Sequence, residues 1–324
     1  FLRIRVLLVL TKLSAKIRKK GKVHMNQKSI IKVREGYCHK NLIDDLSRLS
    51  ERYPQIEIIN IGKSVLGRSI PAVKLGDGPR KIHYNGSFHA NEWITSLLLM
   101  VFIEKFLEAK VSNNDYLGIN VNSLWQKNTL WVIPMVNPDG VDLVQNGFSP
   151  DNPYYRNVLQ ANKGSTNFRN WKANIRGVDL NDQFPANWER EYTRRKITEP
   201  APLNYPGPHA LSEPEAKAIA NFTLEKQFDL VIAFHAQGEE IYWGYEKLEP
   251  EESSRIIKRF QKVSGYRAIR YVDSDAGYKD WFIYKWQKPG FTVECGLGQN
   301  PLPISQFPAI WSKVSKIMLE GLIT

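Results

Sequence analysis

Apolar and polar residues follow two different periods along this chain, and the periods alternate. Short runs that are apolar, or that alternate with a period of two, are bounded by Gly, Ser or Lys and predict strands. These runs are residues 56–62, 69–76, 81–87, 129–140 (ending in the turn signal NPDG), 229–235 and 291–296. Longer segments with helical spacing predict helices at residues 40–53, 93–110, 212–228, 252–264 and 307–322, with Pro54 and Gly265 as stop signals.

The alternation favours an α/β fold, in which a sheet is covered by helices on both faces, because several of the strands are apolar almost throughout. The helix at 212–228 has Ser212 as its predicted N-cap, with Glu215 three positions later completing a capping box. Residues 145–210 are irregular and rich in Asn, Pro, Gly and aromatic residues. Loops of that length in a compact domain tend to be functional.

Charge is distributed unevenly. The net charge of +12 suggests a polyanion partner, but residues 1–24 contribute eight of those charges and no acid, which leaves +4 for the rest. We therefore expect no nucleic acid partner. The apolar run VLLVL in this arm is too short to span a membrane, so no transmembrane segment is predicted. The interpretation is a basic arm at 1–24, either upstream translated sequence before Met25 or a surface-binding arm, and a single catalytic domain at 25–324.

Cysteine is scarce, since Cys38 and Cys295 are the only two. Two thiols form no disulfide framework, and this favours a reducing compartment. Without a convincing export signal, the prediction is a cytoplasmic protein, with a secreted or wall- or spore-associated protein as the alternative.

Polar residues stand at or just beyond the ends of several predicted strands. In open α/β sheets, ligands bind at the carboxyl ends of strands. In YNGSFHANEW (84–93), His89 and Glu92 are three apart across a strand-to-helix turn, so both side chains can face one ion. A catalytic zinc commonly takes two His and one carboxylate and keeps its fourth position for water. Of the remaining histidines, His235 is the best third ligand because it ends an apolar strand as His89 does.

Hydrolysis at such a site also needs a general base. Glu294 stands inside the apolar run FTVECG, where an unpaired carboxylate would be costly. It is therefore either a catalytic base or one partner of a structural salt bridge.

These motifs resemble the zinc metallocarboxypeptidases of the carboxypeptidase A type over about residues 45–322. The resemblance is carried by HANE, NPDG, GVDLN, the His that ends an apolar strand, and FTVE, in that order. It implies a mixed, largely parallel eight-stranded sheet with helices on both faces. It also implies one Zn²⁺ per chain held by His89, Glu92 and His235, with Glu294 as the base of amide hydrolysis.

One departure from the family pattern narrows the range of substrates that we expect. The family reads GVDLNRN or GVDANRN, whereas this chain reads GVDLNDQ: Asn181 is kept, and Asp182 replaces the Arg that clamps a terminal carboxylate. An acid cannot bind a carboxylate in that way. Residues 167–189 are similar to a branch of the family formed by bacterial γ-D-glutamyl-L-diamino acid endopeptidases, which cut peptidoglycan peptides. Asp182 is then the candidate for the distal ammonium of diaminopimelate and Lys279 the candidate for its carboxylate.

Two further family roles have two candidates each. The cation that stabilises the oxyanion is Lys172, which fits the register best, or Arg169. The tyrosine near the bound substrate is Tyr271, with Tyr278 as the competing position.

The sequence therefore predicts zinc-dependent hydrolysis of the γ-D-glutamyl–diaminopimelate bond in peptidoglycan stem peptides (muropeptides). Three alternatives remain: a carboxypeptidase of broader peptide specificity, a zinc acylase on N-acyl amino acids, and a non-catalytic wall-binding protein on the same scaffold.

Overall fold

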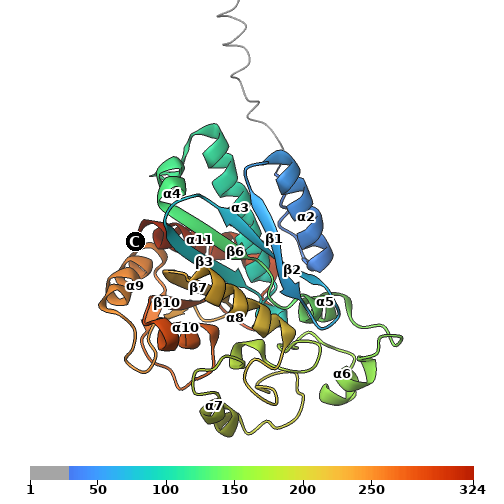
Figure 1. The fold of residues 1–324 in the computed structure, drawn as a ribbon. Helices are drawn as coiled ribbons and strands as arrows, with labels where there is room; N and C mark the ends of the chain where they lie inside the picture. The colour runs from blue at the N-terminus through green and yellow to red at the C-terminus, as the bar shows by residue number, and fades with distance from the viewer. Residues whose placement is uncertain (1–28) are drawn as a thin grey trace, which may run out of the picture.

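The computed structural model describes residues 29–324, so the arm predicted at 1–24 lies outside the described residues. An eight-stranded sheet forms the centre of the molecule (Figure 1), in the order β1-β2-β6-β3-β7-β10-β8-β9. Its strands are β1 (Glu57–Lys63), β2 (Ser69–Leu75), β3 (Arg80–Gly86), β6 (Asn128–Ile133), β7 (Leu230–His235), β8 (Glu240–Tyr242), β9 (Arg267–Ile269) and β10 (Gly290–Glu294).

The middle of this sheet is parallel and its flanks are mixed. Strands β6, β3, β7 and β10 pair in parallel, whereas β1 with β2, β2 with β6, and β10 with β8 pair antiparallel. Every residue of β7 is buried, because a central parallel strand is covered on both faces. The predicted fold class, a mixed and largely parallel eight-stranded α/β sheet, is confirmed.

Helices cover both faces of the sheet. One face packs against α2 (His39–Arg52), α3 (Ile94–Ser112), α4 (Val121–Lys127), α9 (Glu251–Ser264) and α11 (Phe307–Ile323). The other face packs against α8 (Pro214–Lys226) and α10 (Tyr278–Trp286). Helix α3 is apolar on nearly all sides because it is covered on nearly all sides, and it ends at Asn113, which adopts a left-handed conformation.

The irregular segment 145–210 contains little regular structure. After α5 (Pro138–Asn146) it forms α6 (Tyr155–Ala161), the 3₁₀ helix η2 (Leu180–Asp182) and α7 (Trp188–Arg195). Figure 1 shows α6 and α7 beyond one end of the sheet, in the lower part of the view, with α6 to the right and α7 to the left. This segment therefore lies over a sheet edge and leaves the two covered faces to the longer helices.

Two shorter strands, β4 (Asp115–Tyr116) and β5 (Ile119–Asn120), form a separate hairpin. Among residues 29–324, no helix combines the length and apolar character needed to cross a bilayer.

The capping box predicted for α8 is wrong. The helix begins at Pro214 after Glu213, and no side chain caps it. The Ser212 hydroxyl donates instead to Gln183 Oε1 and Glu213 Oε1. Proline at the first helical position already removes one of the orphan N–H groups that a cap would satisfy.

Candidate metal centre

The carboxyl ends of three neighbouring parallel strands bring the candidate residues together. Gly86, at the end of β3, pairs with Phe234 of β7, and Glu294, at the end of β10, pairs with His235. His89 follows β3 by three residues and immediately precedes the 3₁₀ helix η1 (Ala90–Glu92). Strand pairing therefore places residues that are far apart in sequence at one edge, as predicted for an open α/β sheet.

The three predicted metal ligands form one compact, buried cluster. His89 Nδ1 lies 2.8 Å from Glu92 Oε1, and His235 Nδ1 lies 3.0 Å from both His89 Nδ1 and Glu92 Oε2. The tight η1 turn aims His89 and Glu92 at the same point. Ala236 N also donates to Glu92 Oε2 at 3.2 Å, which fixes the carboxylate against the end of β7.

This cluster fits a zinc ion. In a tetrahedral site with ligand bonds near 2.1 Å, the donor atoms stand about 3.3 Å apart. The donor atoms of His89, Glu92 and His235 lie within 4.8 Å of one another, and their closest pairs are at 2.8–3.0 Å. Two imidazoles and one carboxylate are also the donor set of catalytic zinc sites that keep a fourth position open. Within residues 29–324, this is the one group of His, Cys, Asp and Glu residues with metal-binding geometry.

Electrostatics favour a cation at the same point. Burial disfavours charge on Glu92, but the nearby His89 and His235 outweigh burial and hold the pKa of Glu92 well below its usual range. Burial also opposes a charged His89, and Glu92 outweighs it, which raises the pKa of His89 to about 9. The carboxylates around this point therefore attract positive charge, which a divalent cation would supply.

Asp179 is a candidate site residue that the sequence reasoning missed. Its Oδ1 lies 3.2 Å from His89 Nε2, on the side of the ring away from the cluster. A carboxylate there fixes the ring orientation and the tautomer of a metal-binding His. Burial alone would raise the pKa of Asp179, but Lys172 and His89 hold it well below its usual range. The signal was present, since Asp179 is the acid of the quoted GVDLN motif.

Glu294 is placed beside the ligands rather than in a salt bridge. The structure gives its carboxylate no ion pair among the described residues, and its side chain is partly exposed at the strand end. Burial and the negative charge of Glu92 raise its pKa to about 8, against the opposing effect of His89 and Lys172. The structure thus favours the base over the structural salt bridge.

Lys172 is a cation linked to the cluster through Asp179. Its Nζ lies 3.6 Å from Asp179 Oδ2, and its backbone oxygen accepts a hydrogen bond from Ala90 N at 3.0 Å. Burial lowers the pKa of Lys172, but Asp179 and Glu92 outweigh it, so the net shift is upward and the ammonium stays charged. The second bond ties Lys172 directly to the η1 turn that carries the ligands.

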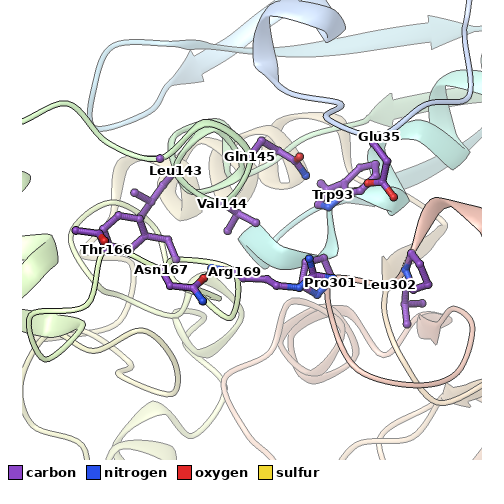
Figure 2. Close-up of a pocket in the computed structure, with 13 residues that line it drawn as sticks. Glu35, Trp93, Leu143, Val144, Gln145, Thr166, Asn167, Arg169, Pro301 and Leu302 are labelled. Atoms are coloured by element: carbon purple, nitrogen blue, oxygen red, sulfur yellow. Dashed lines mark hydrogen bonds between the residues drawn. The ribbon is translucent and has the colours of Figure 1, made fainter.

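Arg169, the other candidate, lines a neighbouring pocket instead. This pocket has a volume of 470 Å³. Figure 2 shows Arg169 among its lining residues, together with Glu35, Trp93 and Pro301. Because Trp93 directly follows Glu92, the pocket borders the metal-ligand segment. Arg169 is exposed.

The residues predicted to bind substrate lie in η2, in the loop before α10 and in the first turn of α10. Asn181 and Asp182 belong to η2, directly after Asp179. Asn181 N donates to Asp179 Oδ1 at 3.1 Å, and its Oδ1 accepts from Tyr278 N at 3.3 Å. Both oxygens of Asp182 are taken by Arg195, at 2.9 and 3.0 Å. An ammonium at Asp182 would therefore compete with a guanidinium.

Lys279 is buried rather than on the surface. Its Nζ donates to the backbone oxygen of Gly244 at 2.9 Å and to Asp280 Oδ1. A lysine ammonium has three donors, so one remains for a ligand. The second oxygen of Asp280 has no hydrogen-bond partner among residues 29–324 and lies 2.6 Å from where a Cβ on Gly277 would stand.

The two candidate tyrosines separate clearly. Tyr278 is fully buried, and its hydroxyl pairs with Thr223, so it is a core residue. Tyr271 is exposed and donates to Glu249 Oε1 at 2.8 Å. It packs near Gly244, whose carbonyl oxygen accepts from Lys279. Tyr271 is therefore the candidate with an exposed side chain, whereas Tyr278 meets Asn181 only through its backbone N–H.

The sheet carries two His and one Glu as candidate metal ligands at its carboxyl edge, and Glu294 lies beside them. This arrangement is typical of metal-dependent hydrolases. The zinc carboxypeptidase family model matches residues 42–315, so the chain belongs to that family and is a metallopeptidase. Its predicted membership of that family is confirmed.

Individual relatives agree with this assignment. The chain is 47% identical to γ-D-glutamyl-L-diamino acid endopeptidase 1 of Lysinibacillus sphaericus over 294 residues, which cover 90% of this chain and 74% of the relative. It is 43% identical to the protein YqgT of Bacillus subtilis (strain 168), over 86% of this chain and 75% of the relative. The crystal structure of thrombin activatable fibrinolysis inhibitor superposes with a TM-score of 0.72 at 18% identity, over 91% of this chain and 76% of the other, which supports the fold.

Proposed function

We propose that this protein hydrolyses the γ-D-glutamyl–diaminopimelate amide bond of peptidoglycan stem peptides (muropeptides) and uses one zinc ion per chain. The observation that carries the proposal is a complete His89, Glu92, His235 and Glu294 site in a chain 47% identical, over 90% of its length, to an endopeptidase named for that bond. Asp182 stands where the family motif has the arginine that clamps a terminal carboxylate, so recognition of the residue beyond the scissile bond departs from that of a carboxypeptidase with the family motif.

The residues of the cluster divide the chemistry among them. Zinc, when bound by His89, Glu92 and His235, lowers the pKa of a water molecule and polarises the substrate carbonyl. Glu294 accepts the proton of the attacking water on its carboxylate and then returns it to the nitrogen of the leaving amine. Lys172 places a positive charge where negative charge develops on the carbonyl oxygen. A lysine does this as a point charge, without the fork of an arginine.

The distal end of diaminopimelate carries both an ammonium and a carboxylate, and the first turn of α10, with Lys279 and Asp280, offers both complementary charges. We assign the carboxylate to the remaining donor of Lys279. Asp182 was the sequence-based choice for the ammonium, but Arg195 already holds both of its oxygens. We therefore move that role to Asp280, whose second oxygen faces the space beside Gly277. Asn181 and Tyr271 border the same region as further substrate contacts.

The pocket beside Trp93 and Arg169 is suited to the other half of the substrate. A γ-linked D-glutamyl residue keeps a free α-carboxylate, and the pocket carries the cationic Arg169. This gives Arg169 a binding role on the amino side of the scissile bond. Lys172, which contacts Asp179, takes the oxyanion role.

Digestion of synthetic L-Ala-γ-D-Glu-diaminopimelate by the zinc-loaded protein tests the proposal. We expect mass spectrometry to detect free diaminopimelate and L-Ala-D-Glu, and we expect Glu294→Gln to yield neither at a comparable rate. Cleavage of N-acyl amino acids without cleavage of this peptide would favour the acylase. Zinc binding without any hydrolysis would favour a wall-binding protein.

Substrate selectivity is tested separately with Lys279→Ala, Asp280→Asn and Asp182→Ala. Each variant is compared on peptides that end in diaminopimelate or in lysine, because lysine lacks the distal carboxylate. We expect Lys279→Ala to lose most of its preference for diaminopimelate. If no variant changes the preference, this recognition scheme is wrong.

We also propose that the reaction takes place in the cytoplasm. Both cysteines are free and buried, which agrees with a reducing, cytoplasmic compartment in which wall peptides of a bacterial cell are processed. We also propose that residues 25–324 act as one catalytic domain whose partner is the peptide substrate and not a nucleic acid.

A further inference from the structure

Helix α7 brings a second cationic side chain to the site, which the sequence motifs do not mark. Arg195 is the last residue of this helix, and its guanidinium lies against Asp182. Nε donates to Asp182 Oδ2 at 2.9 Å, and Nη2 donates to Oδ1 at 3.0 Å. This bidentate pair places an arginine beside Asp182, the residue that stands in the GVDLND motif where the family has its carboxylate-binding arginine.

Two buried acids fix Arg195 in place. Asp182 is 3% exposed, and Glu191 is fully buried with its Oε1 2.6 Å from Arg195 Nε. Asp182 N also donates to Asp179 O at 3.1 Å, and Asp179 in turn holds His89. Arg195 is therefore connected to a metal ligand through a short chain of fixed groups.

One edge of the Arg195 guanidinium remains free. Asp182 and Glu191 occupy the Nε side, and within residues 29–324 Nη1 has no partner. The side chain keeps 27% of its surface exposed. A guanidinium has five N–H donors in a rigid fork, so the Nη1 and Nη2 edge can hold a second carboxylate in a bidentate pair.

The neighbouring arginines of α7 do not share this arrangement. Arg190 pairs with Asp275 and Glu246, and Arg194 pairs with Glu191, Asp273 and Asp275. Neither contacts Asp182. The helix thus uses two arginines to anchor itself to the loop at 273–275 and directs the third towards η2.

We propose that Arg195 binds the free α-carboxylate of the residue on the carboxyl side of the scissile bond, with Asp182 and Glu191 as the positioning residues. The inference rests on the proposed function for the identity of that residue, diaminopimelate. It changes the role of Asp182 from a ligand of the substrate ammonium to the support of a carboxylate clamp. Asp182 of the motif and Arg195 of α7 together take the place of the single arginine that the family motif carries.

Binding of matched ligands tests this inference without turnover. L-Ala-γ-D-Glu-diaminopimelate is prepared with its α-carboxylate either free or as the primary amide. Each peptide is titrated by calorimetry into zinc-loaded Glu294→Gln protein, alone and combined with Arg195→Met. We expect the parent to bind the free acid about 10- to 100-fold more tightly than the amide, and Arg195→Met to remove that difference.

Two further variants separate recognition from folding. Arg190→Met removes a guanidinium from the same helix without touching Asp182, and it should keep the preference for the free acid. Arg195→Lys keeps the charge but loses the fork, so it should keep a reduced preference. A preference that survives Arg195→Met, or no preference in the parent, overturns the inference. So does an equal loss of affinity for both ligands with Arg195→Met, which indicates a structural role.

The same comparison on an α-linked dipeptide, with a free or amidated terminus, separates this inference from the proposed function. If the wild-type protein cleaves only the α-linked peptide, and Arg195→Met abolishes its preference for the free terminus, the proposed substrate is wrong and the clamp stands. If the γ-D-glutamyl peptide is cleaved and Arg195→Met has no selective effect, the substrate stands and the clamp is wrong.

Discussion

At the residue scale, Glu294 stands out because its pKa is raised and because, within residues 29–324, its carboxylate forms no ion pair although it lies beside the candidate metal ligands. Substitution by Gln keeps the volume and removes the proton acceptor. Since general acid–base catalysis contributes roughly 10²- to 10⁴-fold, we expect kcat of Glu294→Gln to fall by about that factor. Zinc content, measured by atomic emission, should stay at one ion per chain. A variant that keeps full activity would contradict the assignment of Glu294 as base.

A substitution at Asp179 tests whether its carboxylate affects metal binding through His89. Asp179→Asn preserves the shape but weakens the acceptor that faces His89 Nε2. Loss of such a partner typically lowers metal affinity about 10- to 100-fold. Competition with a chromophoric chelator measures the zinc dissociation constant. Unchanged affinity would show that the backbone, rather than Asp179, orients the ring.

The residues that sequence reasoning could identify are those whose motif spacing is local. His89 and Glu92 are three positions apart, and His235 and Glu294 each end an apolar strand. Arg195 has no such signal: it lies thirteen positions from Asp182 in an irregular segment, and only the fold of that segment joins the two. Its role depends on tertiary packing, which neither periodicity nor a short motif encodes.

At the element scale, strand and helix positions were predictable because burial imposes the period. Strand β7 is apolar throughout since it is central, and α3 is apolar on nearly every side since it is enclosed. The start of α8 was predicted wrongly, because Ser212 and Glu215 both found tertiary partners that outcompete a local capping box. The order of strands in the sheet was also beyond the sequence pattern, since it depends on pairing between distant segments.

Glu215, in the first turn of α8, leads us to predict that the stability of the protein depends on pH. Glu215 is fully buried. Burial, together with the nearby charges of Asp139 and Glu213, raises its pKa to about 8. Hydrogen bonds such as the one from Val65 N oppose this shift but are outweighed. Because the folded state holds this proton more tightly than the unfolded chain, the stabilisation is complete below the unfolded pKa of about 4.3. It is lost as pH rises through about 8.

We therefore expect Glu215→Gln to flatten the decline in stability between pH 5 and 8, an effect of roughly 1–3 kcal/mol. Urea unfolding followed by tryptophan fluorescence at several pH values measures it. Glu225→Gln is the matched control, since Glu225 lies on the exposed side of the same helix. A slope that is identical in Glu215→Gln and the parent would show that other groups cause the pH dependence.

At the scale of the whole molecule, the metal site joins segments that only the complete sheet brings together. His89 and His235 are 146 residues apart in sequence, and their Nδ1 atoms are 3.0 Å apart in the fold. The pairing of β3 with β7 is what closes that distance. An unfolded chain holds no such cluster, so zinc binds mainly to the native state and stabilises it by mass action.

This linkage predicts that zinc raises the melting temperature. At a free zinc concentration 100-fold above the dissociation constant, the stabilisation is about 2.7 kcal/mol, which corresponds to a shift of roughly 5 °C for a domain of this size. Differential scanning fluorimetry of chelator-treated protein, with and without added zinc, measures the shift. His235→Gln removes one of the three ligands and leaves β7 intact, so it should lose most of the shift. Equal shifts in both proteins would place the zinc elsewhere, and magnesium serves as the control for a general effect of divalent cations.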